Sequence, residues 1–137
     1  MALTHLADTS VLTRLGEHEV AAAIRPLLER AVLARSAMTD LEIGFSARNG
    51  DEWHALADAL ELCGALEIEA ADFRRALEVQ RLLAVARQRG RKVPDLLIAA
   101  VAERHRLTVL HYDGDVDLIA ALTGQPAEWV VPAGSID

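Results

Sequence analysis

The chain has 137 residues, of which 52% are hydrophobic and 26% are charged. This composition excludes a disordered protein, and the length suits one domain that buries about two-thirds of its unfolded surface. The formal net charge of −7 argues against a protein that binds nucleic acid by bulk electrostatic attraction. A nucleic-acid enzyme is still compatible with this charge, because an acidic active site contributes several of the negative groups.

Three features of the sequence favour a cytoplasmic protein without membrane attachment. The single cysteine, Cys63, cannot form an internal disulfide, which favours a reducing compartment. The longest apolar run, residues 96–102, is far too short to span a membrane. The first residues carry no basic region and resemble a strand rather than a signal peptide. We therefore expect one cytoplasmic domain over residues 1–137.

Short apolar strands alternate with amphipathic helices along the chain. The expected elements are a strand over 3–7, helices over 9–15 and 20–31, a strand over 32–37, helices over 41–48 and 53–63, a strand over 66–68, helices over 73–90 and 95–106, a strand over 108–112, a helix over 116–122 and a strand over 129–131. Pro26 lies inside the second helix, which is therefore expected to be kinked or to begin late. Asn49 and Gly50 are expected to end the third helix.

Strands separated by helices predict an α/β fold with right-handed crossovers and a parallel sheet covered on both faces. In such sheets, ligands bind beyond the carboxyl ends of the strands. Asp8 and Asp113 directly follow predicted strands, and Glu42 lies in the first turn of the helix after the second strand. Asp95 opens a helix instead. It reaches the same edge only if that helix runs antiparallel to its neighbours or begins close by.

Four acidic motifs carry the strongest functional signal. They are Asp8 in L-A-D-T-S, Glu42 in T-D-L-E, Asp95 in K-V-P-D and Asp113 in L-H-Y-D-G-D. A fold that brings them together places four carboxylates around one point. Carboxylate oxygens bind hard cations, and a Mg²⁺ or Mn²⁺ held in this way suits phosphodiester hydrolysis.

Each motif also has a purely structural explanation. Asp8 or Ser10 could cap the helix that follows. Thr39 and Glu42 match a capping box, which the sequence alone favours over a catalytic role for Glu42. Asp95 complements a helix dipole, although it opens the most apolar helix of the chain, where a carboxylate needs a partner or a metal.

The closely spaced acids Asp113, Asp115 and Asp117 suggest a calcium loop, but such a loop needs Gly at position 118 and Glu at position 124. The chain has Leu118 and Gly124 instead. A site at the strand end fits better, with Asp113 as the first ligand and Asp115 as a helix cap or second ligand. Asp117 is expected to be a solvated helix residue.

Basic residues near the acids are candidates for positioning RNA phosphates. Arg14 follows Asp8 by one or two helical turns. A second group precedes Asp95 and fits equally well as cations at a helix C-terminus. This group consists of Arg87, Arg89, Arg91 and Lys92. The five histidines show no metal-ligand spacing, and His111 is expected to be a packed residue.

Taken together, the motifs resemble the PIN-domain family, and within it the VapC-type ribonuclease toxins of bacterial toxin–antitoxin pairs. The resemblance covers nearly the whole chain. Its anchors are an opening strand with D-T-S, T-x-x-E about thirty residues later, P-D-L-L-I-A-A-V-A, and H-x-D-x-D before a final helix and strand. One such motif is weak evidence, whereas four in this order are fairly specific.

The resemblance implies a three-layer α/β/α fold with a parallel sheet of four or five strands, in which the helix of Asp95 begins at the site. Its implied catalytic residues are Asp8, Glu42, Asp95 and Asp113. Its implied Mg²⁺ or Mn²⁺ ligands are Asp8, Asp95, Asp113 and Asp115, with Ser10 in support. It also implies an RNA substrate and a small antitoxin whose C-terminal segment covers the acidic groove.

The resemblance further implies a homodimer. Apolar helical surface supports this expectation, since a small monomer usually exposes little of it. The residues concerned are Trp53 and the stripe of Val20, Ile24, Leu27 and Leu28.

Other functions compete with the toxin. A PIN nuclease with a housekeeping role in RNA processing, or one that cuts DNA, would use the same residues. A dehalogenase-type phosphatase would need a second acid where the chain has Ser10. A receiver-like binding domain would need an acidic pair near the first strand and an Asp after the third strand, and neither is present in the sequence.

Overall fold

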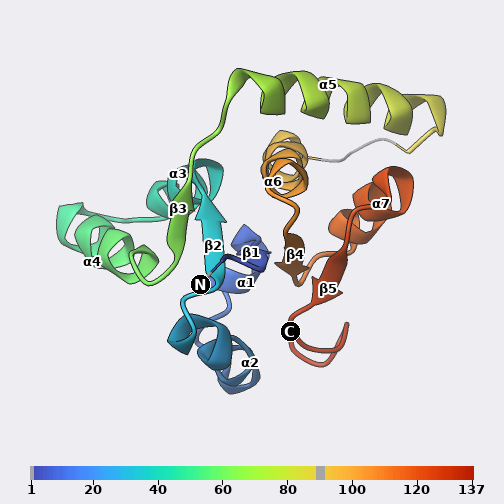
Figure 1. The fold of residues 1–137 in the computed structure, drawn as a ribbon. Coiled ribbons are helices and arrows are strands. Elements are labelled where there is room, and N and C mark those ends of the chain that lie inside the picture. Colours follow the sequence, from blue (N-terminus) through green and yellow to red (C-terminus); the bar gives the residue numbers. More distant parts are fainter. Residues whose placement is uncertain (1, 89–91) are drawn as a thin grey trace.

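The computed structural model describes residues 2–88 and 92–137, and these contain five strands in one parallel sheet, in the order β3-β2-β1-β4-β5 (Figure 1). The strands are β1 (His5–Ala7), β2 (Leu33–Ser36), β3 (Gly64–Leu66), β4 (Thr108–His111) and β5 (Ala127–Trp129). The helices are α1 (Thr9–Leu12), α2 (His18–Glu29), α3 (Ala37–Phe45), α4 (Gly50–Leu60), α5 (Ala70–Val85), α6 (Val93–Arg104) and α7 (Gly114–Thr123). The predicted α/β class and parallel sheet are confirmed.

Helices cover both faces of the sheet because successive strand residues point to opposite sides. Leu6 of β1 packs on one face with Ile98 and Val101 of α6. Its neighbour Ala7 packs on the other face with Val11 of α1 and Val20 of α2. All but Ile98 are fully buried, and Ile98 is nearly so. The result is the predicted arrangement of three layers.

The register of β1 and β4 determines where the acids emerge. Ala7 pairs with Leu110, and the backbone N–H of Asp8 donates to the Leu110 carbonyl at 2.9 Å. Asp8 thus leaves the sheet beside the end of β4, and Asp113 follows β4 by two residues. The central strand β1 and its neighbour β4 therefore place their acids at the same edge of the sheet.

Helix α3 begins at Ala37, four residues before the predicted start at residue 41. Ser36, the last residue of β2, is its N-cap, and the Ser36 hydroxyl accepts a hydrogen bond from the Thr39 backbone at 3.4 Å. Glu42 consequently lies in the second turn, and the capping box expected from Thr39 and Glu42 is wrong. The structure forms a capping box elsewhere, between Glu69 and Asp72 at the start of α5.

Two further boundaries differ from prediction. Helix α3 ends at Phe45, before Asn49, so Asn49 does not end it as predicted. The Asn49 side chain instead accepts from the Glu52 backbone at 2.8 Å and caps α4. Helix α2 begins at His18 and continues through Pro26, so it does not begin late. Among the described residues, no helix is both long enough and apolar enough to cross a bilayer.

Candidate active site

Four predicted acids line one hollow of about 480 Å³ at the carboxyl ends of β1 and β4. The four are Asp8, Glu42, Asp95 and Asp113. Asp8 follows β1, Asp113 follows β4, Glu42 comes from α3, and Asp95 lies in the first turn of α6. The start of α6 is therefore at the site, which answers the question that the strand pattern left open for Asp95.

Asp8 is almost completely buried, with 2% of its surface exposed. Its Oδ2 accepts hydrogen bonds from the Ser10 backbone N–H at 3.1 Å and from the Ser10 hydroxyl at 2.5 Å. The Ser10 oxygen accepts in turn from the Tyr112 backbone at 2.9 Å. Ser10 thus fixes Asp8 against the chain just after β4. Oδ1 of Asp8 is buried and has no hydrogen-bond partner among the described residues.

Burial raises the pKa of the Asp8 carboxyl, although hydrogen bonds from Ser10 oppose the increase. The same effect acts on Asp95, which is 7% exposed. Burial, followed by the negative charges of Asp8, Asp113, Asp115 and Glu42, raises the pKa of Asp95 to about 7. Oδ2 of Asp95 is likewise buried without a hydrogen-bond partner in the described part of the chain.

Asp113 caps α7, and its Oδ1 accepts from the Asp115 backbone at 2.9 Å. One carboxylate oxygen each from Asp95, Asp113 and Asp115 lies within 4.8 Å of the other two. Asp8 is outside this triad but lines the same hollow. Carboxylate oxygens at such spacing are suited to a hard divalent cation, so the residues fit a Mg²⁺ or Mn²⁺ site.

A chain of hydroxyls positions Glu42. The Thr9 hydroxyl donates to Glu42 Oε1 at 2.7 Å and lies 2.9 Å from the Thr39 hydroxyl. Because Thr9 has one hydroxyl proton and gives it to Glu42, Thr39 must be the donor in the second contact. Thr39 is fully buried, so the chain anchors Glu42 to the interior of the protein.

The Thr9→Val variant tests this anchoring. Valine keeps the shape of threonine but cannot donate to Glu42, so we expect RNA cleavage to show a roughly tenfold lower kcat with little change in KM. The Thr9→Ser variant keeps the hydroxyl and should retain most of the kcat. Equal kcat values for the valine variant and the unmodified protein, at equal melting temperatures, would show that Glu42 does not depend on this contact.

His111 is a packed residue, as the sequence suggested. It is fully buried, and its ring centroid lies 4.9 Å from that of Trp129. Its Nδ1 accepts from the Asp113 backbone at 3.2 Å, and its Nε2 lies 3.1 Å from Asp117 Oδ1. Burial lowers the pKa of His111 despite the opposing charges of Asp117 and Asp8. A neutral ring therefore supports the backbone of Asp113.

Asp117 is an exposed residue of α7, as the sequence suggested, and its carboxylate also makes two contacts. Its Oδ2 accepts from the Trp129 indole at 2.7 Å, while Oδ1 faces His111. It therefore ties α7 to β5 and to His111 at the end of β4.

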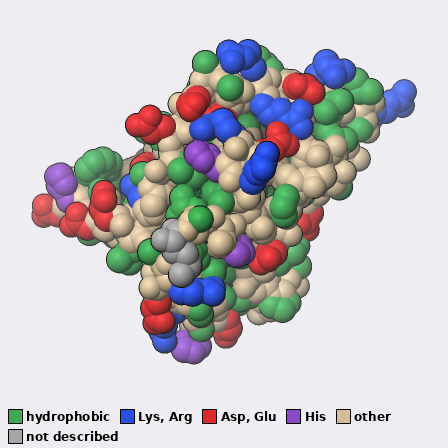
Figure 2. Space-filling model, in the orientation of Figure 1, with side chains coloured by type: hydrophobic (Ala, Val, Ile, Leu, Met, Phe, Trp, Pro, Cys, Tyr) green, Lys and Arg blue, Asp and Glu red, His purple; other side chains and the backbone are tan. Residues whose placement is uncertain are grey.

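Only some of the predicted basic residues lie at the acidic hollow in the described part of the chain. Arg14 and Lys92 line the acidic hollow, whereas Arg87 is exposed beyond the end of α5 and does not line it. Arg89 and Arg91 fall outside the described residues. Figure 2 shows Lys and Arg side chains gathered over α5 with acids among them, so this face is not uniformly positive.

Sequence reasoning missed three contributors to the hollow or its support. Thr9 and Tyr112 line the hollow, and Thr39 is the buried end of the hydroxyl chain. The spacing of Thr39 and Glu42 was a usable signal, because residues three apart share a helix face. The same spacing also fits a helix cap, and the sequence alone favours the cap.

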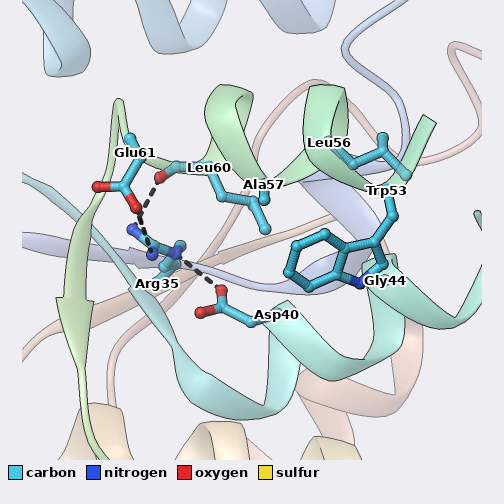
Figure 3. Close-up of a pocket in the computed structure, with 8 residues that line it drawn as sticks. All are labelled: Arg35, Asp40, Gly44, Trp53, Leu56, Ala57, Leu60 and Glu61. Carbon is cyan, nitrogen blue, oxygen red and sulfur yellow. Dashed lines mark hydrogen bonds and ion pairs between the residues drawn. The ribbon is translucent and has the colours of Figure 1, made fainter. Parts of the chain in front are cut away.

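A second hollow, of about 230 Å³, lies between α3 and α4 (Figure 3). Buried Arg35 donates to Asp40 at 2.7 Å and to the carbonyls of Leu60, at 2.7 Å, and Cys63. It thereby holds the end of α4 against β2 and α3. The Trp53 indole covers Gly44, where an added Cβ would lie 2.9 Å from the indole nitrogen. These contacts give Arg35 and Trp53 structural roles in packing α4 against α3.

Comparison with known proteins agrees with this geometry. The PIN-domain family model matches residues 6–122. Ribonuclease VapC51 of Mycobacterium tuberculosis is 58% identical over 137 residues, which covers 100% of both chains. Ribonuclease VapC21 of the same species is 42% identical, over 98% of this chain and 99% of that protein.

Solved structures share the fold. A chain of the DNA-bound VapBC structure from Salmonella typhimurium has a TM-score of 0.78 at 13% identity, over 94% of this chain and 99% of that one. VapBC-5 of Mycobacterium tuberculosis has a TM-score of 0.57 at 27% identity, over 93% and 96%. The matched domain, the full-length relatives and the acidic hollow agree, and the chain belongs to the PIN-domain family, within its VapC branch.

Proposed function

We propose that this protein is a metal-dependent endoribonuclease and the toxin of a toxin–antitoxin pair, acting in the cytoplasm as a single domain over residues 1–137. The observation that carries the proposal is the meeting of Asp8, Glu42, Asp95 and Asp113 in one hollow, where two buried carboxylate oxygens find no hydrogen-bond partner within residues 2–88 and 92–137. The relatives named as VapC ribonucleases support the choice of RNA as substrate.

In this proposal, Asp95, Asp113 and Asp115 hold Mg²⁺ or Mn²⁺ together with Asp8. When bound, the ion lowers the pKa of a water molecule and stabilises the leaving oxygen of the phosphodiester. Ser10 keeps Asp8 in place, and Thr9 keeps Glu42 directed as an acceptor toward the same hollow. Arg14 and Lys92 at the rim are suited to hold phosphates of the RNA.

The deciding experiment is cleavage of total RNA with Mg²⁺ or Mn²⁺, with excess EDTA as the comparison, followed by mapping of the new ends. A small set of metal-dependent cuts in RNA is the expected result. Cleavage of DNA in preference to RNA, or cuts confined to precursor RNAs, would instead support the housekeeping or DNA-nuclease alternative.

A small antitoxin is the proposed partner, and toxin–antitoxin complexes among the structural neighbours support it. We expect it to place an Arg side chain against Asp8, Glu42, Asp95 or Asp113, because a guanidinium can replace the charge of the metal and bind a carboxylate with two hydrogen bonds. Inhibition should weaken as Mg²⁺ or salt increases. Co-purification with the neighbouring gene product, followed by an Arg→Ala series in it, measures this. A bound partner that leaves cleavage unchanged contradicts the expectation.

Self-association is also proposed, but the apolar surface that supports it differs from the one expected from the sequence. Val20 and Ile24 are buried in the protein's own core, so the α2 stripe cannot be the dimer surface. Trp53 is 48% exposed, and other apolar side chains are exposed on α3 and α5, among them Phe45 and Leu77. We expect light scattering at micromolar concentration to give the mass of a dimer, and a monomer mass would contradict this.

A further inference from the structure

Arg14 is a cation fixed at the rim of the acidic hollow. Its Nη1 donates to the Ser10 carbonyl at 2.9 Å, and its guanidinium carbon lies 5.0 Å from the centre of the Tyr112 ring. It lines both the acidic hollow and an adjoining one that it shares with Thr13, Gly16, Glu17 and Asp137. Its side chain is 28% exposed, so it is held in place yet accessible to a ligand.

The Asp137 carboxylate occupies the remaining edge of this guanidinium. Arg14 Nε donates to Asp137 Oδ1 at 3.2 Å, and Nη2 donates to Oδ2 at 3.1 Å. Two parallel N–H donors of Arg are the same group that binds a phosphate with two hydrogen bonds. A phosphate and the Asp137 carboxylate therefore cannot both bind this edge.

The fold itself delivers Asp137 to this place. The Tyr112 hydroxyl donates to the Ile136 carbonyl at 2.6 Å and accepts from the backbone N–H groups of Gly134 and Ile136, at 3.0 and 3.2 Å. Ile136 is buried in the core, and Gly134 has a φ of +77°, which favours glycine at this turn. Tyr112 thus contacts Arg14 with its ring and anchors the segment of Asp137 with its hydroxyl.

We propose that Asp137 is a built-in counter-ion that an RNA phosphate must displace from Arg14. The inference rests on the proposed ribonuclease function and adds a regulation to the same site. Asp137 weakens RNA binding and leaves the chemical step unchanged, because it contacts Arg14 and none of the four acids that line the hollow. Its carboxylate is 53% exposed, so displacement carries a modest cost, equivalent to a change of about fivefold or less in affinity.

The test is a mutant cycle on RNA binding. A fluorescent single-stranded RNA is titrated without cleavage into protein that carries Asp8→Asn, with Asp137→Asn, Arg14→Gln or both added. We expect Asp137→Asn to tighten binding by about threefold to fivefold and Arg14→Gln to abolish that gain. The matched control is Glu17→Gln, which removes one negative charge from the same adjoining hollow without touching an Arg14 ion pair.

A second measurement does not depend on RNA. In the protein with its natural Asp8, the side-chain Nε–H resonance of Arg14 is followed by NMR as inorganic phosphate is added. It should respond at lower phosphate concentration in the Asp137→Asn variant. RNA binding that is equal with and without Asp137, or a gain from Glu17→Gln as large as that from Asp137→Asn, overturns the proposal and leaves the ribonuclease function intact. If no variant binds RNA but the Arg14 resonance still responds at lower phosphate concentration in Asp137→Asn, the proposed RNA function is wrong and the role of Asp137 as a counter-ion is supported.

Discussion

The Asp8→Asn variant should lose about a hundredfold or more of metal-dependent RNA cleavage while keeping its fold. Asparagine has nearly the shape of aspartate and keeps an oxygen for the Ser10 hydrogen bonds, but it removes the negative charge that faces the proposed metal. Because burial already raises the pKa of the Asp8 carboxyl, the ionised group is costly to the folded protein. The free energy of unfolding without metal should therefore stay constant or increase.

The measurements for Asp8→Asn are cleavage rates across a Mg²⁺ titration and thermal unfolding in EDTA. A suitable control is Asp58→Asn, which removes the same charge from an exposed position on α4. Asp58→Asn should cleave like the unmodified protein. Equal cleavage by Asp8→Asn and the unmodified protein would remove Asp8 from the mechanism, and a large loss of stability would show that its main role is to support the fold.

Much of the fold follows from patterns that are local in the sequence. Alternating apolar strands and helices predicted the order of elements and the parallel sheet, because each strand is short and each helix carries an apolar face. The edge positions of Asp8 and Asp113 followed from the same pattern. Local patterns failed where two residues compete for one role. Ser36 and Thr39 are both good caps, and only the end of β2 decides in favour of Ser36.

The remaining errors concern contacts between distant segments. The α2 stripe is apolar whether it covers its own sheet or a partner, so sequence could not show that Val20 and Ile24 belong to the core. The Thr9–Thr39 contact joins residues thirty positions apart. The pKa of Asp95 likewise depends on acids from three other segments. This contact and this pKa arise only when distant segments assemble the hollow, and no single motif encodes them.

The pH dependence of the metal-free protein should reveal this assembled hollow. The folded-state pKa of Asp95 is about 7, against an ordinary value of 3.8. The folded protein therefore holds a proton that the unfolded chain releases, so this carboxyl favours folding most at low pH. That contribution is lost as pH increases from about 4 through 7, and it amounts to roughly 4 kcal/mol of unfolding free energy. Asp8 acts in the same direction, and the two titrate as a coupled group.

The comparison that isolates Asp95 is urea unfolding of the unmodified protein and of Asp95→Asn in EDTA, between about pH 5 and pH 8. Other carboxylates work in the opposite direction. At Asp72, burial acts to raise the pKa, but the hydrogen bonds from Arg104 and from the Glu69 backbone, together with the charge of Arg104, lower it, so the stabilisation by Asp72 is lost as pH falls. The difference between the two proteins cancels such contributions. We expect Asp95→Asn to become the more stable protein as pH increases through 7.

Bound Mg²⁺ should stabilise the unmodified protein but not Asp95→Asn, and should therefore make the unmodified protein the more stable of the two. Protons and Mg²⁺ compete for the same carboxylates, so Mg²⁺ affinity should increase steeply as pH passes through about 7. At pH 8, saturating Mg²⁺ should stabilise the unmodified protein by binding to the folded state, with little effect on Asp95→Asn. Calorimetric titration with Mg²⁺ at pH 6 and pH 8 measures the affinity directly. The same affinity at both pH values would show that Asp95 is already ionised at pH 6, and that the hollow does not raise its pKa to about 7.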